Sequence, residues 1–273
     1  MRKSKKSNTF IQLDILSIIS ISIIVFIVQN ILHEFVGHGG ATLLVGGKLI
    51  SLTTSYLESN LDSASVLGRR IVAAAGPLVN ILFGMLFWII LKWKNITNSS
   101  FKYFLWLFMT VNLLTGTGYF LFSGVAGIGD WINAISGFAL IWMWRIIMIV
   151  TGIFLYLLVI FLSLKELNVF IGADSIRHKR ALRLSLIPYL SGSIATTIGA
   201  FLNPVSFLFV FTSAASTFGG ASGLAWMTQL YSTKLFPKIH NQPITIKRNW
   251  LWILVAISLL LVHVFLLGPG IKF

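Results

Sequence analysis

The sequence predicts an all-α integral membrane protein with about seven transmembrane helices and a short surface β-hairpin after the first of them. Three observations lead to this fold class. The 273 residues are 56% hydrophobic and only 10% charged, with a mean hydropathy of +0.89, whereas about 25% of a soluble domain is charged. Several apolar runs reach the ~20 residues that cross a bilayer. Basic residues lie mainly in the short segments between those runs.

The apolar runs are predicted to be the transmembrane helices, and no domain boundary or low-complexity linker separates them. Residues 1–273 are therefore expected to form a single polytopic membrane domain. The first run is longer than the apolar core of a signal peptide and is not followed by a cleavage site, so we expect it to remain in the membrane. The seven expected spans are residues 11–32, 71–91, 101–122, 142–164, 184–202, 205–227 and 250–267.

Two kinds of local pattern lie between and within these spans. Residues 47–58 alternate in polarity and contain β-branched side chains, which favours a short hairpin at the surface. The stretches SGSIATTIGA (191–200) and SAASTFGGASG (213–223) are dense in small residues, which is typical of closely packed membrane helices. Asn203 and Pro204 indicate a turn between them.

The distribution of Lys and Arg predicts the orientation of the chain. Sixteen of the 21 basic residues lie in the N-terminal tail and in the segments after the second, fourth and sixth spans. By the positive-inside rule, the N-terminus is expected in the cytoplasm and the C-terminus outside it. The other five basic residues, expected outside, are Lys48, Arg69, Arg70, Arg145 and Lys272.

The net charge of +14 does not indicate a nucleic-acid-binding protein, because the basic residues form no basic face or recognisable module. We expect them to meet anionic lipid instead. Cysteine is absent, which excludes disulfides, thiolate metal ligands and cysteine nucleophiles. Only seven residues are acidic. Glu34 and Asp130 are two of them, and the predicted topology puts both at the outer end of a span, where an ionisable group marks a functional site.

The stretch ILHEFVGHGG (31–40) places His33, Glu34 and His38 close together. Two imidazoles and a carboxylate are natural zinc ligands, but residues five apart on a regular helix point about 140° away from each other. A π-bulge would align His33 with His38. Alternatively, Glu34 and His38 would be the ligands, with His33 behind them. The third alternative is that these polar residues only end a span at the lipid headgroups.

Asp130 is the candidate third metal ligand. It ends the glycine-rich stretch SGVAGIGDW (123–131), directly after the third span. The alternative is that it caps a helix that begins at Trp131. With Asp130 as a ligand beside His33 and His38, Glu34 is free to act as the general base that takes a proton from water.

A second motif gives these residues a family context. The second span begins RRIVAAAGPLVNILFGMLF (69–87), with Gly76, Pro77 and Asn80 in an A-x-G-P-x-x-N pattern. A histidine-glutamate motif followed by this pattern resembles the site-2 proteases, which are intramembrane zinc metalloproteases. The resemblance covers about the first 135 residues, and the role of residues 136–273 is left open.

The resemblance implies that His33, His38 and Asp130 bind zinc, that Glu34 is the catalytic base and that Asn80 borders the site and positions substrate. It also implies that a hairpin at 47–58 holds substrate in an extended form. For Asn80, the alternative is a hydrogen bond across helices. The chain departs from the family pattern in the five-residue histidine spacing, which is similar to H-E-L-L-G-H of the dipeptidyl peptidase III family, and in Gly-Ile-Gly-Asp-Trp around the aspartate.

We therefore expect an intramembrane zinc metalloprotease that hydrolyses peptide bonds of transmembrane or membrane-proximal proteins. The alternative is a non-catalytic polytopic membrane protein, such as an inactive protease relative, a transporter or a scaffold. A serine protease is disfavoured. Ser222 in GASG and His263 are its only candidates, and the predicted topology places them toward opposite faces of the ~30 Å core.

Overall fold

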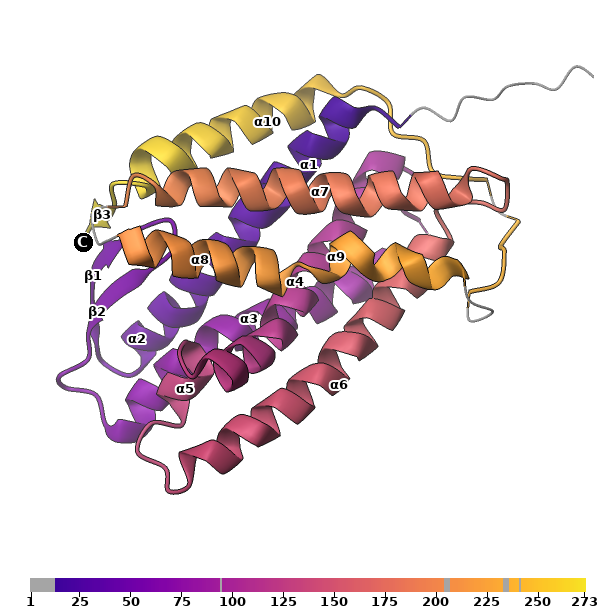
Figure 1. Ribbon diagram of the computed structural model, residues 1–273. Helices are drawn as coiled ribbons and strands as arrows, with labels where there is room; N and C mark the ends of the chain where they lie inside the picture. The colour runs from indigo at the N-terminus through magenta and orange to yellow at the C-terminus, as the bar shows by residue number, and fades with distance from the viewer. Residues whose placement is uncertain (1–12, 94, 204–206, 233–235, 241) are drawn as a thin grey trace, which may run out of the picture.

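The computed structural model describes residues 13–273 except 94, 204–206, 233–235 and 241. The described chain is mostly helical, and its long helices run between the same two ends of the molecule, with a small sheet at one end (Figure 1). Pro204 of the expected turn and six basic residues of the topology argument, Arg2, Lys3, Lys5, Lys6, Lys94 and Lys234, lie outside the described residues.

Five helices of the described chain are long and apolar enough to cross a membrane, where the sequence predicted seven spans. The first is a continuous rod that extends to Leu44, twelve residues beyond its predicted end, because the helix continues through the glycines after His33. The five are Ile15–Leu44 (α1, Ile15–Ile31; η1, Leu32–Gly39; α2, Gly40–Leu44), α3 (Val66–Leu91), α4 (Ser99–Ala126), α6 (Ile141–Asn168) and Trp250–Leu267 (α10, Trp250–Leu261; η3, Val262–Leu267).

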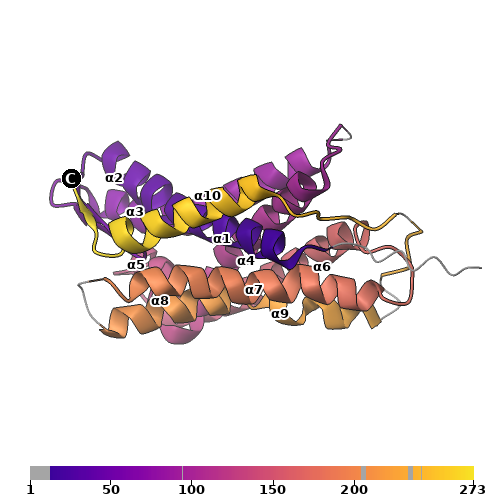
Figure 2. The same cartoon turned by 90° about the horizontal axis from the view of Figure 1, so that it is seen from above.

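The predicted fifth and sixth spans are helices that do not meet this description. Helix α7 (Arg177–Ala200) is long enough but begins with Arg177, Lys179, Arg180 and Arg183, so its uncharged part is shorter than the ~20 residues of a span. Helix α8 (Phe207–Gly220) is 14 residues long in the described chain. In Figure 2, α7 and α8 form a layer that lies beneath α1 and α10.

The hairpin predicted at 47–58 is present, and a third strand extends it. Strands β1 (Lys48–Leu52) and β2 (Leu57–Asn60) are antiparallel, with Leu52 opposite Leu57. Strand β3 (Ile271–Lys272), at the C-terminus, pairs with the other edge of β1, which gives the order β2-β1-β3. The remaining elements are α5 (Asp130–Ala134), α9 (Gly223–Trp226) and the 3-10 helix η2 (Met227–Ser232).

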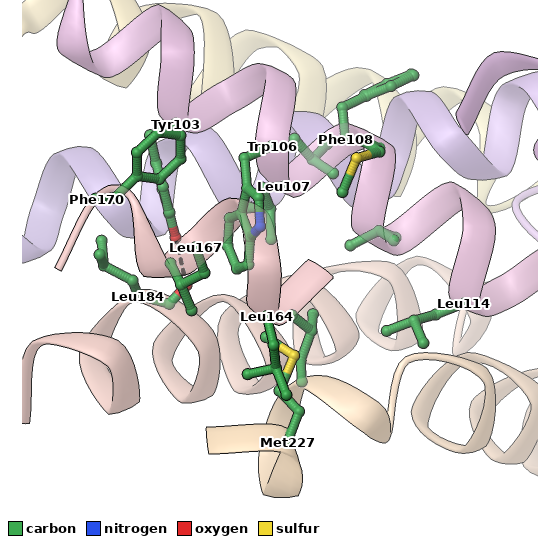
Figure 3. Packing of buried hydrophobic residues seen from close by; sticks show 14 of the residues in the cluster. Tyr103, Trp106, Leu107, Phe108, Leu114, Leu164, Leu167, Phe170, Leu184 and Met227 are labelled. Atoms are coloured by element: carbon green, nitrogen blue, oxygen red, sulfur yellow. Dashed lines mark hydrogen bonds between the residues drawn. The ribbon is translucent and has the colours of Figure 1, made fainter. Parts of the chain in front are cut away.

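Helix α4 forms the centre of the main hydrophobic core. Its side chains are buried on every face between Tyr103 and Leu114, where α3, α6, α8 and α1 surround it. The polar aromatic groups that α4 contributes to this core have partners, as buried N–H and O–H groups require. The Tyr103 hydroxyl donates to the Leu184 carbonyl at 2.9 Å (Figure 3), and the Trp106 indole donates to the Ser163 carbonyl at 3.0 Å.

The small residues predicted to allow close helix packing do so. A Cβ atom at Gly192 of α7 would lie 2.2 Å from the ring of Phe26 on α1, and one at Gly199 would lie 2.6 Å from His263 on η3. Real Cβ contacts do not occur at such distances, so α7 approaches both neighbours because it carries glycine at those points.

The sheet and the charged loops lie at opposite ends of the bundle. At the far end, the amide of Asp14 donates to Ile246 at the start of α1, and Lys92 forms an ion pair with Glu166 between the ends of α3 and α6. At the other end, β1 to β3, α2, α5 and the C-terminus lie together (Figure 1). The histidine motif and Asp130 are at this second end.

Candidate metal centre

The segment with the histidine motif is a π-helix. Residues Leu32–Gly39 form η1, which joins α1 to α2 without a break in the rod. A π-helix has i→i+5 hydrogen bonds, so residues five apart lie on one face. The rings of His33 and His38 accordingly lie 4.9 Å apart between centroids, edge to face. The predicted π-like widening is confirmed, and Nε2 of both histidines faces Asp130.

The two histidines meet Asp130. His33 Nε2 lies 3.1 Å and His38 Nε2 3.6 Å from the same oxygen, Oδ2, of Asp130. The three ligand atoms of the group lie within 4.8 Å of one another. His33 is only 4% exposed and Glu34 9%, so the motif does not simply end a span at the headgroups.

Hydrogen bonds behind the rings fix the direction of each imidazole. His38 Nδ1 lies 2.7 Å from the Val72 carbonyl, which is only an acceptor, so Nδ1 carries the proton and Nε2 presents a lone pair. His33 Nδ1 is 3.2 Å from Oδ1 of Asn80, which gives the same tautomer. Such partners are the usual support of metal-binding histidines, because they fix the tautomer and the ring orientation.

Gly76 makes room for both rings. A Cβ atom at this position of α3 would lie 2.5 Å from His38 Nε2 and 2.7 Å from His33 Nε2. On η1, a Cβ at Gly37 would lie 2.7 Å from the Cα atom of Gly76. The two glycines therefore let η1 and α3 cross in contact. This contact explains physically why the glycine of the A-x-G-P-x-x-N pattern is paired with the histidine motif.

A glycine turn places Asp130 opposite the histidines. Helix α4 ends at Ala126, with Gly127 as its C-cap. Gly127 and Gly129 have φ values of 70° and 90°, which residues other than glycine rarely adopt. Helix α5 begins at Asp130 itself and its N-cap, Gly129, makes no side-chain hydrogen bond. The alternative that Asp130 caps a helix beginning at Trp131 is therefore wrong.

The group has the chemistry of a cation site. Asp130 Oδ2 is buried, and Nε2 of His33 and Nε2 of His38 converge on it. When the two imidazoles are neutral, all three groups are acceptors and a cation between them satisfies them; when the imidazoles are protonated, their charge does so. The pKa of Asp130 responds to such charge. Burial raises this pKa, but with charged imidazoles at His33 and His38 it falls well below its ordinary value.

The two distances from Asp130 to the histidines suit a bound metal ion. In a tetrahedral site with metal–ligand bonds of about 2.0–2.1 Å, two ligand atoms lie about 3.3 Å apart. The 3.1 and 3.6 Å separations of the histidine nitrogens from Asp130 Oδ2 bracket that value. Three protein ligands are also the number in catalytic zinc sites, whereas structural zinc sites use four.

A cavity of about 490 Å³ opens beside the three ligands. Glu34, His33, His38 and Asp130 line it, together with residues 55–57 of the hairpin. Glu34 lines this cavity next to His33 and His38. A carboxylate next to the ligands, and not among them, is the arrangement that a general base requires.

Asn80 lies behind the site. It is completely buried and contacts His33, and it is absent from the residues that line the cavity. The alternative prediction for Asn80, a hydrogen bond across helices, is confirmed. Its partner is His33, one of the candidate metal ligands. Asn80 therefore orients His33 in the structure, and it does not face the space where a substrate would lie.

Several residues of the site were not predicted. The ring of Tyr119 stacks on His33 with centroids 4.9 Å apart, and Ser216 and Thr217 of α8 line the cavity. Arg145 of α6 donates from Nε to the Gly124 carbonyl at 2.9 Å and from Nη2 to the Val125 carbonyl at 2.7 Å, so it fixes the end of α4 before the Asp130 turn. No sequence motif marks these residues, because only the packing of distant helices brings them to the site.

Ser222 and His263 do not form a catalytic pair. The Ser222 hydroxyl lies 3.1 Å from the hydroxyl of Tyr156, and His263 Nε2 lies 3.2 Å from the Thr196 carbonyl. Each has a different partner, as the sequence argument against a serine mechanism expected.

Comparison with known proteins adds no family assignment. No protein-family model matches the chain, and no significant match was found among curated proteins or solved structures. The class of the protein therefore follows from its own residues. It is a polytopic membrane protein, with five helices able to cross a membrane and a buried His-His-Asp group able to hold a metal ion.

Proposed function

We propose that this protein is an intramembrane zinc peptidase of the site-2 protease type. The observation that carries the proposal is the convergence of His33, His38 and Asp130 beside a cavity that Glu34 also lines. Zinc is the ion preferred by two imidazoles and one carboxylate, and a set of three protein ligands leaves a position for chemistry. The buried Gly76 and Asn80 support the same ligands from the second motif of the family pattern.

Each side chain then has a defined role in hydrolysis. Zinc would be held by His33, His38 and Asp130 and would supply Lewis-acid activation of water and of a peptide carbonyl. Glu34 accepts the proton from the attacking water and returns it to the departing amine. Asn80 and the Val72 carbonyl keep the two imidazoles directed at the ion.

The hairpin favours a peptide in extended form as the substrate. Strand β2 is at the edge of the sheet, and of the described strands only β1 pairs with it. Leu57 and Ser59 of β2 line the cavity, so a peptide added to this edge would run past the metal ligands. A transmembrane helix hides its carbonyls in its own hydrogen bonds, so a substrate helix must unwind locally before cleavage.

The loop charges indicate on which side of the membrane the proposed site lies. The basic segments lie at the end of the bundle opposite the site, and we place that end in the cytoplasm by the positive-inside rule. The metal ligands, the hairpin and the C-terminus are then at the extracytoplasmic end. Membrane lipid and transmembrane or membrane-proximal proteins are the partners that this arrangement implies.

The test is peptide hydrolysis by the purified protein in lipid nanodiscs with one equivalent of zinc. We expect cleavage of membrane-protein segments, and a Glu34→Gln variant that keeps its zinc but is about 10²- to 10⁴-fold slower. Gln29 lines the same cavity without being a ligand, so Gln29→Ala is the matched control and should stay within about threefold of wild type. A zinc-loaded wild type that cleaves no peptide would refute a peptidase function.

A further inference from the structure

A second cavity adjoins the metal centre on the side away from the hairpin. It has a volume of about 290 Å³ and lies between α4, α6 and α8. It shares Tyr119, Phe122 and Ser216 with the larger cavity. Tyr119 stacks on the ring of His33 and forms a hydrogen bond with Ser216, so one side chain separates the second cavity from a metal ligand.

The wall of this second cavity is suited to an apolar group. Leu121, Phe122, Val125 and Ala126 form one side of it. On the other side, the hydroxyl of Tyr156 donates to the Gly220 carbonyl at 2.8 Å and accepts from the Gly223 amide at 2.8 Å. These polar groups are satisfied within the protein, so a polar ligand group would lose its hydrogen bonds to water without replacement.

The size of the cavity suits a large side chain and is too small for a helix. A volume of about 290 Å³ is at the lower limit of the ~300–1,000 Å³ of small-molecule sites, and a helix with its side chains is about 10–12 Å wide. Glycines keep this space open. A Cβ at Gly118 would lie 3.4 Å from the Cα of Gly220, at van der Waals contact, and a Cβ at Gly219 would meet no atom within 4 Å.

We infer that this cavity is a specificity subsite that takes a large apolar side chain next to the cleaved bond of an extended peptide. The inference rests on the proposed peptidase function. In an extended peptide, successive side chains point to opposite sides at intervals of about 3.3 Å. A peptide that pairs with β2 across the metal centre therefore presents alternate side chains to the two faces of the extended sheet, and the subsite would take one of these side chains past Tyr119.

Gly219→Leu tests the subsite because Gly219 lines the cavity and is exposed at its rim, where a Cβ would meet no atom within 4 Å. Ala215→Leu is the matched control, since Ala215 is an exposed residue of the same helix outside both cavities. The substrates are peptides with Ala, Leu or Phe in turn at each residue flanking the cleaved bond. Wild type should prefer Leu or Phe over Ala at one of these residues by about tenfold in kcat/KM.

In Gly219→Leu, that preference should disappear through a loss of about tenfold or more for the Leu and Phe peptides. Cleavage of the Ala peptide and zinc content should remain within about twofold of wild type, and Ala215→Leu should behave as wild type. An equal loss for all peptides, or an unchanged preference, would overturn the inference.

A binding measurement separates the subsite from the activity. In a Glu34→Gln background, a peptide with benzoylphenylalanine at the preferred residue should crosslink to segments 118–126 or 216–222, and Gly219→Leu should abolish the crosslink. Crosslinks there without hydrolysis by the wild type would refute the peptidase but support the subsite. Crosslinks elsewhere, or a bound phospholipid that Gly219→Leu displaces in native mass spectrometry, would overturn the subsite.

Discussion

The described part of the chain contains two π-helical segments with a buried histidine, and one of the two has the features of a metal site. η1 carries His33 and His38, and η3 carries His263. Both segments pack against a glycine of a neighbouring helix. A Cβ at Gly76 would lie 2.7 Å from His33 Nε2, and one at Gly199 would lie 2.6 Å from His263 Cδ2. Both also lie at the end of the bundle that contains the sheet.

The difference lies in what the imidazoles face. Nε2 of His33 and of His38 face the Asp130 carboxylate and a cavity. His263 Nε2 faces the backbone carbonyl of Thr196, and within the described chain its Nδ1 has no partner. A π-helix, a buried histidine and a close glycine are therefore features of tight helix packing. A second histidine, a carboxylate and an open cavity are what distinguish η1.

The largest effect on zinc content should come from a substitution at Gly76, and the corresponding substitution at Gly199 provides the comparison. Gly76→Ala places a methyl group against both ligand nitrogens, so zinc content should fall from about one per chain to below about 0.1. Gly199→Ala crowds His263 but should lower only thermal stability. Gly40→Ala is the neutral control, because its Cβ would meet no atom within 4 Å. Metal analysis and melting curves of the three variants measure this contrast, and equal zinc in Gly76→Ala and wild type would contradict it.

Removal of the hydrogen bond behind His33 should have the next effect. Asn80→Ala leaves His33 Nδ1 without its partner, so zinc affinity should weaken by about 10- to 100-fold. Asn112 is also a completely buried asparagine, but it donates within its own helix to the Phe108 carbonyl at 2.9 Å. Asn112→Ala should therefore leave zinc affinity unchanged. Competition with a chelating dye measures both variants, and equal affinities would remove Asn80 from the site.

The C-terminal strand should affect peptide binding without affecting the metal. β3 pairs with β1, the Phe273 amide donates to the Ile50 carbonyl at 2.9 Å, and the Thr54 amide donates to the Leu267 carbonyl at 3.0 Å. Deletion of residues 269–273 loosens the hairpin, so KM for peptides should rise about tenfold with zinc content unchanged. Phe273→Ala keeps the backbone pairing and is the control. A lower zinc content in the deletion variant would mean that β3 supports the ligands instead.

The smallest effect is expected at His263. His263→Asn keeps a donor in the region of the Thr196 carbonyl and should cost about 1–3 kcal/mol of stability, with zinc content and peptide hydrolysis equal to wild type. Thermal unfolding beside metal analysis checks this. A loss of zinc in His263→Asn would erase the distinction between the two π-helical segments.

The sequence was sufficient to predict the parts of the site that depend on local spacing. Histidines five apart on a helix either diverge or require a π-helix, and the glycines after His33 ease that distortion, so the π-helical form of η1 could be deduced. The hairpin followed from its alternating pattern. The residue at which the first helix ends could not be deduced, because glycines such as Gly37 and Gly39 are typical of a helix end. Only their packing against other residues shows that the helix continues.

The parts that depend on contacts between distant helices were beyond the sequence. Tyr119 and Arg145 belong to no motif, and only the packing of α4 on α6 and η1 brings them to the site. Residues 136–273 resembled no known family, yet α8 lines the cavity and β3 completes the sheet. Five helices of the described chain are long and apolar enough to cross a membrane, whereas α7 and α8, the predicted fifth and sixth spans, do not meet that description within the described residues.

The most direct test of the metal centre is the zinc content of purified wild type, His38→Ala, Asp130→Ala and His263→Ala, measured by mass spectrometry at equal protein concentration. The His-His-Asp group predicts about one zinc per chain in wild type and His263→Ala, and less than about 0.1 in the two ligand variants while they remain folded. Zinc that stays at one per chain in both His38→Ala and Asp130→Ala would show that these residues do not hold the metal.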